Sequence, residues 1–263
     1  MRRLRMNALR LVGLLLVSAL ALQLYFLGRI ALMRWVDPAS TTFQRSEMVR
    51  LGVEQHQILW SQRWQPYERI ANSLKRAVIA SEDAGFVEHS GVEWDALEKA
   101  WERNQRAEAR ADRLNQTLEK RKQQAEARGR PAPSVPAKVE PKVVGGSTIS
   151  QQLAKNLFLS GERTALRKAQ EFVITFMLEA LLPKRRILEI YLNHVEWGEG
   201  VFGAQAAARH YFGVDASQLS NSQAARLAVM LPAPKRFEQR PASGYLLSRA
   251  GTVAARMGAV VLP

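Results

Sequence analysis

An apolar run close to the N-terminus limits what this chain can fold into more than any other feature of its sequence. The run covers Leu11–Leu27, Gln23 is its one strongly polar residue, and the apolar character continues to residue 33. A helix of 17 to about 23 residues is long enough to cross a hydrocarbon core of ~30 Å, so we predict a transmembrane anchor over residues 11–33. Residues 1–10 contain four arginines and no acid. This basic tail predicts a cytoplasmic N-terminus, with the chain beyond the anchor on the outer face of the cytoplasmic membrane.

A cleaved signal peptide is the alternative for this segment, because Ala19-Leu20-Ala21 resembles a small-x-small cleavage site. The apolar stretch continues past Ala21, which favours a retained anchor. A core helix of a soluble domain is disfavoured by the terminal position and by the basic flank.

Charge and cysteine content narrow the classes of function. The 263 residues include 38 basic and 24 acidic ones, which gives a formal charge of +14 and a pI near 10.6. Such a charge points to an anionic partner, which could be nucleic acid, a phospholipid surface or a phosphorylated substrate. The absence of cysteine excludes a disulfide scaffold, a cysteine-ligated zinc site, an iron–sulfur cluster and a thiol nucleophile.

Beyond the anchor, apolar residues recur mostly with the spacing of α-helices. Period-two alternation is scarce and no alternation of strands with helices is evident, so the fold should be mainly α. Residues 36–68 are mixed and aromatic. The pattern predicts helices over residues 69–81, 95–128, 148–158, 164–182, 184–195, 200–212, 220–231 and 243–258.

A charged excursion interrupts the predicted domain at about residues 100–143. Residues 98–142 contain 12 basic and seven acidic side chains. The prolines that begin at Pro131 stop helix formation and favour an extended linker. The simpler interpretation is a solvated helical excursion without chemistry. The alternative is an electrostatic contact with anionic lipid headgroups.

Glu82 is the first candidate for catalysis. It follows Val78 by four residues and Leu74 by eight, so it falls on the edge of the apolar stripe of the first predicted helix after residue 68. A carboxylate there is partly withdrawn from water, which raises its pKa toward the range useful for general acid–base catalysis. The alternative is a carboxylate near a helix end that local hydrogen bonds hold in place.

The segment Gly145–Asn156 predicts an anion-binding helix N-terminus. Thr148 and Gln151 fit a capping box, and the two preceding glycines permit close approach of a ligand to the backbone. The N–H groups and the dipole at the start of such a helix favour a phosphate. A well-capped structural helix is the alternative, but polar side chains are concentrated here: Ser147, Ser150, Gln151, Gln152, Lys155 and Asn156.

A third cluster contains Arg163, Arg167, Lys168 and Glu171. On a helix, Arg167 and Lys168 can both reach Glu171, which lies four and three residues after them. An ordinary surface ion-pair cluster is the alternative. Against it, apolar residues follow from Phe172 onward, so this helix should enter the core.

Motifs of several other chemistries are rejected or absent. Residues 198–203 match the bare G-x-G-x-x-G string, but helix instead of strand is predicted before them. We therefore reject dinucleotide binding and expect a loop between two helices. The four histidines lack metal-ligand spacing, and the sequence contains neither a Ser-x-x-Lys nor a Walker motif.

In their order along the chain, these segments resemble the biosynthetic peptidoglycan glycosyltransferases, the lysozyme-like family 51 that polymerises lipid II. The resemblance covers about residues 45–258 apart from the excursion, and implies a mainly α, lysozyme-like glycosyltransferase domain. The chain is similar to the monofunctional, single-anchor type because a transpeptidase domain is absent. The matching strings are residues 82–91, 145–156, Arg167-Lys168-x-x-Glu171, 184–193 with 198–213, and more loosely 219–234.

The resemblance implies a role for each candidate residue. Glu82 would be the general base that removes a proton from the 4-hydroxyl of the acceptor sugar. Glu171 would assist at the donor, by stabilising charge near the departing pyrophosphate or by helping to hold a divalent cation, expected to be Mg²⁺ although the sequence has no metal motif. The donor-site and pyrophosphate-binding residues would be Ser147, Gln151, Gln152, Lys155, Asn156, Arg163, Arg167 and Lys168.

Three features depart from the family pattern. The spacing from Gly91 to Gly145 is longer than usual because it contains the excursion. Gln170 stands where some members have a basic residue, which puts one phosphate contact in doubt. Gln223 stands where Glu is frequent, and we interpret this position as structural.

The expected function is therefore polymerisation of lipid II into β-1,4-linked glycan strands, by inverting transfer with release of undecaprenyl pyrophosphate. The expected partners are lipid II, the nascent glycan strand, membrane phospholipid and proteins of cell division or elongation, without nucleic acid. One alternative is a lytic transglycosylase, which cleaves finished glycan with one catalytic Glu and does not need the cations Lys155, Arg163 and Arg167. The other alternative is a catalytically inactive membrane scaffold.

Overall fold

The chain forms two compact units. The computed structural model describes residues 2–127, 138–140, 145–159, 161–162 and 164–263. One unit contains Met1–Val92 and Thr148–Pro263, and the other contains Glu93–Ser147. The charged excursion of the sequence falls in the second unit.

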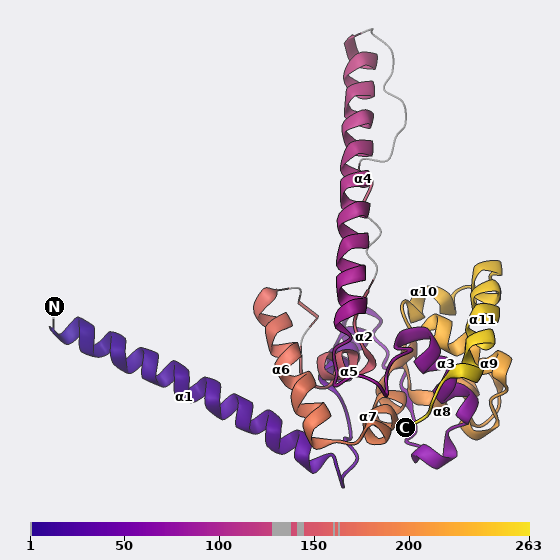
Figure 1. Cartoon of the computed structure of the whole chain (residues 1–263), viewed down its shortest axis with the longest axis horizontal. Coiled ribbons are helices and arrows are strands. Elements are labelled where there is room, and N and C mark those ends of the chain that lie inside the picture. The colour runs from indigo at the N-terminus through magenta and orange to yellow at the C-terminus, as the bar shows by residue number, and fades with distance from the viewer. Residues whose placement is uncertain (1, 128–137, 141–144, 160, 163) are drawn as a thin grey trace. The chain divides into compact units, whose positions relative to one another are not determined.

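Helices dominate the first unit, so the prediction of a mainly α fold is confirmed (Figure 1). Three short 3₁₀ turns connect some of the helices: Tyr67–Arg69, Ala216–Gln218 and Met257–Ala259. The helices are α1 (Arg2–Leu32), α2 (Thr42–Glu54), α3 (Asn72–Glu82), α5 (Ile149–Phe158), α6 (Ala165–Leu181), α7 (Lys184–His194), α8 (Gly203–Phe212), α9 (Asn221–Met230), α10 (Pro234–Glu238) and α11 (Gly244–Arg256).

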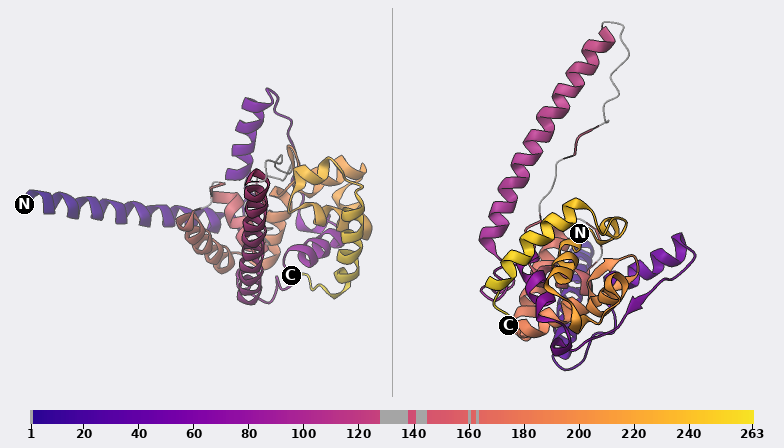
Figure 2. Two further views of the ribbon diagram at one scale, coloured as in Figure 1. Left: turned by 90° about the horizontal axis from the view of Figure 1, so that it is seen from above. Right: turned by 90° about the vertical axis from the view of Figure 1, so that its right-hand side faces the viewer.

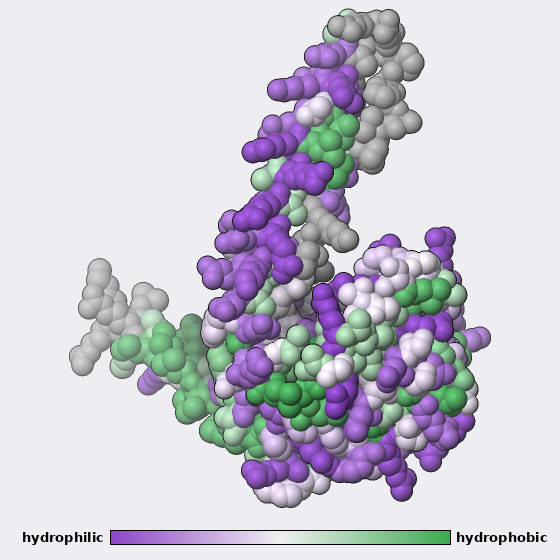
Figure 3. Space-filling model, turned by 45° about the vertical axis from the view of Figure 1, so that its right-hand side comes forward, coloured by the Kyte–Doolittle hydropathy of each residue, from purple (hydrophilic) through white to green (hydrophobic). Residues whose placement is uncertain are grey.

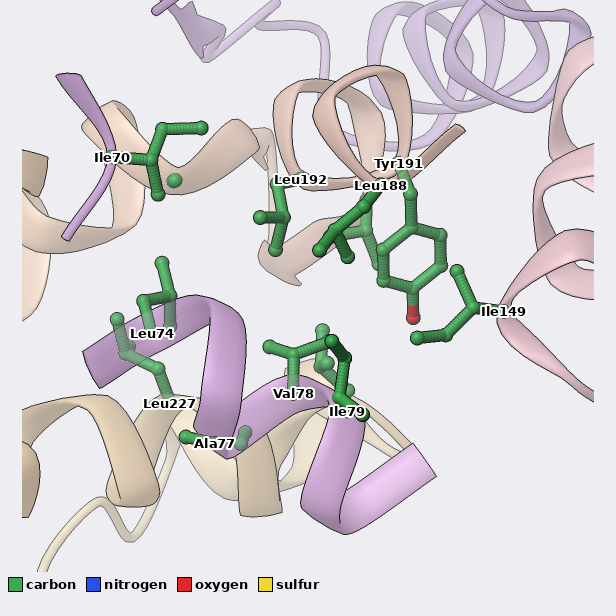
Figure 4. Close-up of a cluster of buried hydrophobic side chains, with 14 of the residues drawn as sticks. Ile70, Leu74, Ala77, Val78, Ile79, Ile149, Leu188, Tyr191, Leu192 and Leu227 are labelled. Atoms are coloured by element: carbon green, nitrogen blue, oxygen red, sulfur yellow. The ribbon is translucent and has the colours of Figure 1, made fainter. Parts of the chain in front are cut away.

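The core of the first unit surrounds α3. Helices α9 and α11 pack side by side on α3 (Figure 1 and Figure 2). Leu74, Ala77 and Val78 of α3 are completely buried. Tyr191 reaches from α7 toward Ile149 of α5 above this layer (Figure 4). The apolar stripe predicted for α3 therefore fixes the helix that carries Glu82 at its last residue.

A small sheet, which joins a hairpin between α7 and α8 to a strand that precedes α3 in the chain, corrects one expectation. Strands β1 (Ser61–Gln62), β3 (Val201–Phe202) and β2 (Glu196–Gly198) pair in the order β1-β3-β2. The G-x-G-x-x-G string therefore forms a hairpin instead of a plain loop, and α8 begins at Gly203 instead of residue 200. Gly200 has φ +71, and a Cβ there would lie 2.0 Å from the carbonyl oxygen of Leu59, so only glycine fits.

Side-chain caps set the starts of several helices. Thr148 and Gln151 form the predicted capping box of α5. Ser220 and Gln223 form another at α9, which confirms a structural role for Gln223. Helix α2 was not predicted from the apolar pattern, although Thr41 and Gln44 form the same kind of box at its start.

Helix α1 has the properties of a membrane anchor. Among the described residues, Met6–Leu32 is the one helix long and apolar enough to cross a membrane, with a mean hydropathy of 2.2. Hydrophobic residues cover its exposed surface (Figure 3). Its last turns are different, because Phe26, Ile30 and Met33 are buried in the core of the first unit. The helix fits a single-pass anchor whose C-terminal end is part of the folded domain.

A pair of amides explains two unusual residues at once. Gln23, the polar residue of the apolar run, donates from Nε2 to Oε1 of Gln170 at 2.9 Å. Gln170 donates back from Nε2 to Oε1 of Gln23 at 3.0 Å. Gln170 lies on α6 directly before Glu171, so the amide pair joins the anchor to the helix of the third cluster. The departure from the family pattern at Gln170 thus has a structural reason.

Exchanging these amides for leucine tests the junction. Gln23→Leu or Gln170→Leu alone leaves one amide without its partner beside an apolar helix, whereas the double variant leaves none. We expect each single variant to lower the free energy of unfolding, with a coupling energy of about 0.5–2 kcal/mol in the double-mutant cycle. Thermal unfolding of the full chain in detergent micelles measures it. Additive losses would show that the pair contributes nothing.

The second unit consists of helix α4 (Trp94–Ala127) and the segment that returns along it. The amide of Asn115 bonds both the carbonyl oxygen and the N–H of Val139, at 3.0 and 2.8 Å. A Cβ on Gly146 would lie 2.8 Å from that of Ala100, so this glycine lets the returning chain pass close to α4. The helix predicted over residues 95–128 is confirmed. The prolines between residues 131 and 141 lie outside the described residues.

Candidate active site

Glu82 ends α3 and joins a chain of partly buried hydrogen bonds. The side-chain Nε2 of Gln152 donates to Oε2 of Glu82 at 3.0 Å. The hydroxyl of Tyr191 donates to Oε1 of Gln152 at 2.9 Å. Helices α3, α5 and α7 each contribute one member, so the orientation of the carboxylate depends on the packing of all three.

Burial raises the pKa of Glu82 above its ordinary value, as the sequence predicts. Hydrogen bonds from Gln152 and Ser81 oppose this shift, and the charge of Asp83 adds to it. Burial, with the charges of Glu82 and Asp83, also raises the pKa of Tyr191 well above its ordinary value. The phenol therefore stays protonated and acts as a donor, and Glu82 has the properties of a proton acceptor working near neutral pH.

Asp83, the next residue, fixes the start of α5. Its Oδ2 accepts the N–H of Ile149 at 2.9 Å, and its Oδ1 lies 2.8 Å from Nε2 of His89. The N–H of Gly91 donates to Nδ1 of His89, so it is Nε2 that carries the proton and donates to Asp83. The hydroxyl of Thr148 donates to the carbonyl of Gly91 at 2.6 Å. The end of α3 and the start of α5 are thereby held together. Sequence reasoning assigned no role to Asp83 or His89.

Two of the polar residues predicted on α5, Gln151 and Ser150, form hydrogen bonds within the domain. The carbonyl oxygen of the Gln151 side chain accepts the N–H of Thr148 at 3.0 Å, and Gln151 is buried, so the cap uses its side chain. Ser150 donates to Glu179 of α6, which also pairs with Lys184 at 2.8 Å. These contacts hold α5 on α6.

Lys155 and Asn156 share a helix face with Gln152, because they lie three and four residues after it. Lys155 is exposed and Asn156 is half-buried. Ser147 is half-buried and belongs to the second unit. Arg163 lies outside the described residues. The substrate contacts of these four residues stay predictions.

Glu171 is bracketed by two cations on α6. Its Oε2 accepts from Arg167 at 2.9 Å and its Oε1 accepts from Lys168. Glu171 is only 3 % exposed, so the alternative of an ordinary surface ion-pair cluster is wrong. One buried carboxylate holds two positive groups in place, and the trio keeps a net positive charge.

The described residues around Glu171 do not form a metal site by themselves. Both carboxylate oxygens already accept hydrogen bonds from cations, whereas Mg²⁺ needs several free oxygen ligands in octahedral geometry. Arg167 and Lys168 would also repel a divalent ion. The described residues around Glu171 therefore do not offer the ligands that the expected Mg²⁺ would need.

Comparison with known proteins identifies the fold and the chemistry. A family model described as Transglycosylase matches residues 52–118 and 134–258. The chain belongs to this transglycosylase family. The expectations of a lysozyme-like domain and of a peptidoglycan glycosyltransferase are confirmed, and the interruption of the match falls in the excursion.

Curated relatives align over almost the whole chain. The chain is 47 % identical to a biosynthetic peptidoglycan transglycosylase of Bordetella pertussis (strain Tohama I), over 98 % of this chain and 97 % of the relative. It is 51 % identical to one of Burkholderia pseudomallei (strain K96243), over 93 % and 83 %. It is 49 % identical to one of Herminiimonas arsenicoxydans, over 96 % and 95 %.

Proposed function

We propose that the chain polymerises lipid II into β-1,4-linked glycan strands at the outer face of the cytoplasmic membrane and releases undecaprenyl pyrophosphate. The observation that carries the proposal is the Glu82 carboxylate, which burial makes more basic and which Gln152 orients. The names of the relatives, which are biosynthetic enzymes, favour synthesis over cleavage of glycan.

The reaction is a single displacement. The 4-oxygen of the acceptor sugar attacks the anomeric carbon of the donor as Glu82 takes the hydroxyl proton. The bond from the anomeric carbon to the phosphate oxygen breaks, and the pyrophosphate leaves with the electron pair. An α-linked donor thereby gives a β-linked product, with no covalent intermediate. The hydrogen bond from Gln152 aims the carboxylate and stabilises its ionised form before the transfer.

The leaving group needs positive charge, and α6 supplies it. Arg167 and Lys168 would stabilise the charge that develops on the departing pyrophosphate. Glu171 would act at the donor by fixing both cations in place. We propose that Lys155, on the face of α5 that carries Gln152, adds to this site. A divalent cation, expected to be Mg²⁺, would then come bound to the pyrophosphate oxygens of the substrate, since the residues near Glu171 offer no free ligands.

The contact between anchor and α6 supports a membrane-embedded substrate. The Gln23–Gln170 pair sets the helix of the cation cluster against the apolar anchor. Leu166, Val173 and Phe176 of α6 are exposed and apolar. A domain held in this way would meet a lipid-linked donor and membrane phospholipid. The N-terminus would be in the cytoplasm, and proteins of cell division or elongation would be its protein partners.

Purified full-length protein and labelled lipid II test the proposal. We expect polymeric glycan and a matching amount of undecaprenyl pyrophosphate. Release of anhydro-sugars from isolated sacculi, without polymer from lipid II, would instead establish the lytic alternative. A protein that does neither would be the inactive scaffold.

The pH dependence of polymerisation reports on Glu82. The base must be deprotonated, so kcat/KM should rise with pH through the pKa of Glu82, which burial places above the ordinary value of 4.5. Gln152→Leu removes a hydrogen bond that lowers this pKa, so the acidic limb should move to higher pH. The exposed Glu88 offers a control, because Glu88→Gln should leave the limb in place. An acidic limb at the ordinary Glu value in both the wild type and Gln152→Leu would contradict the assignment of Glu82 as the base.

A further inference from the structure

Helix α4 is a long rod with one uncovered basic face. It has 34 residues, which corresponds to a length of about 51 Å. Seven of its eight basic residues recur at intervals of mostly three or four, so they lie on one side of the helix, and Lys122 falls on another side. All seven are exposed: Lys99, Arg103, Arg106, Arg110, Arg113, Lys120 and Arg121.

The remaining faces of α4 differ in character. Glu108, Asp112 and Glu119 fall on the side opposite the basic face, whereas Asp95 and Glu102 share the basic face with the seven cations. The third side contains Ala100 and Ala111, which are buried, and it lies next to Asn115, which binds Val139 of the returning segment. The fold of the second unit thus leaves the cations uncovered.

Contacts among the described residues of the second unit leave most of the charge of this face unpaired. Among its described residues, the ion pair on α4 is Arg106 with Glu102 at 3.1 Å, and the two side chains are 78 % and 54 % exposed. Such a pair contributes little to stability and can exchange for another anion at low cost. The seven exposed cations on one face of the helix are therefore available to an anion outside the unit.

The position of the second unit in the chain points to the product of the enzyme. It is inserted between Val92, which closes the segment that begins with Glu82, and Thr148, which caps the helix of Gln152. The family match omits residues 119–133, so part of α4 is an addition to the common domain. A bilayer is a poorer partner, because the side of α4 that Figure 3 shows is largely hydrophilic with a small apolar patch, whereas an interfacial helix has a broad apolar face.

We propose that the basic face of α4 binds the growing glycan strand through the carboxylates of its peptide side chains. Five of the seven cations are arginines, whose planar guanidinium groups bind carboxylates with two parallel hydrogen bonds. A line of cations along a straight helix matches a polymer with repeating anionic substituents. The proposal rests on the proposed function only in naming the strand as the enzyme's product, because finished peptidoglycan carries the same carboxylates.

Binding to finished peptidoglycan therefore tests the proposal independently of catalysis. The variant is the full chain with Arg103, Arg106, Arg110 and Arg113 replaced by Gln. The matched control is the full chain with four exposed cations of the first unit, Arg236, Arg240, Arg249 and Arg256, replaced by Gln, which changes the net charge equally. Each protein is sedimented with purified, lipid-free sacculi over a range of salt concentrations, and its initial rate of lipid II consumption is measured.

The α4 variant should bind sacculi at least about tenfold more weakly than the wild type at low salt, and the control should bind normally. Wild-type binding should weaken as salt rises, and it should be lost on sacculi whose peptide carboxylates have been converted to neutral amides by carbodiimide coupling. Lipid II consumption should continue in the variant. Unchanged sacculus binding by the variant would therefore not contradict the proposed function. A wild-type protein that does not polymerise lipid II would likewise not contradict the binding result.

Two results would overturn the proposal. Equal binding of variant and wild type to sacculi would show that α4 is a solvated helix. A loss confined to vesicles containing anionic phospholipid, with sacculus binding intact, would assign the basic face to lipid headgroups. Every substituted side chain is exposed, so α4 should still form in the variant. Circular dichroism checks this.

Discussion

Replacing Glu82 by Gln is expected to lower the rate of glycan polymerisation by about 10²- to 10⁴-fold, the usual contribution of a general base. The substitution keeps the shape of the side chain and an oxygen that can accept the hydrogen bond from Gln152. It removes the negative charge of the carboxylate and with it the capacity to take a proton. The loss should therefore appear in kcat, with KM for lipid II little changed, and single-turnover kinetics on the purified full chain measures it.

Glu88→Gln is the matched control for this loss. Glu88 lies in the same segment after α3, is exposed, and loses the same charge on substitution. It should polymerise at the wild-type rate. Near-normal activity of Glu82→Gln would show that another group takes the proton, because an active variant must be folded.

Most helices could be predicted because their signals are local. The boundaries of α5 and α9 depend on Thr148 with Gln151 and on Ser220 with Gln223, pairs only three residues apart. Helix α2 carried the same kind of signal, but its apolar residues do not form a stripe. The hairpin of β2 and β3 could not be predicted from periodicity, because strands of two or three residues show none and depend on β1 from a distant part of the chain.

In the candidate site, too, features with a local signal could be predicted and features that depend on distant residues could not. The desolvation of Glu82 and the pairing of Glu171 follow from spacing within one helix, and the structure has both. The bond from Tyr191 to Gln152 spans 39 positions and the bond from Ile149 to Asp83 spans 66. Neither has a local signature, so sequence reasoning found the residues that would react and missed those that hold them. Gln170 shows the limit most clearly, because its partner Gln23 is 147 positions away in the anchor.

Removing both cations of α6, in the variant Arg167→Gln with Lys168→Gln, should lower kcat by about 10²–10³-fold, as the loss of a single donor to a developing oxyanion does in other enzymes. The reason is electrostatic: the pyrophosphate would leave without the positive charge that stabilises it. The same variant also leaves Glu171 buried and unpaired, which can cost about 3–5 kcal/mol of folding stability. Loss of activity alone would therefore be ambiguous.

A triple variant that adds Glu171→Gln separates the two effects. It removes the uncompensated buried charge, so its thermal unfolding should return toward that of the wild type. If the cations act on the leaving group, the triple variant should stay as inactive as the double one despite its recovered stability. If they serve only to balance Glu171, polymerisation should recover with the fold. Arg249→Gln with Arg256→Gln, two exposed positions on α11, controls for the change in net charge and should leave both stability and kcat unchanged.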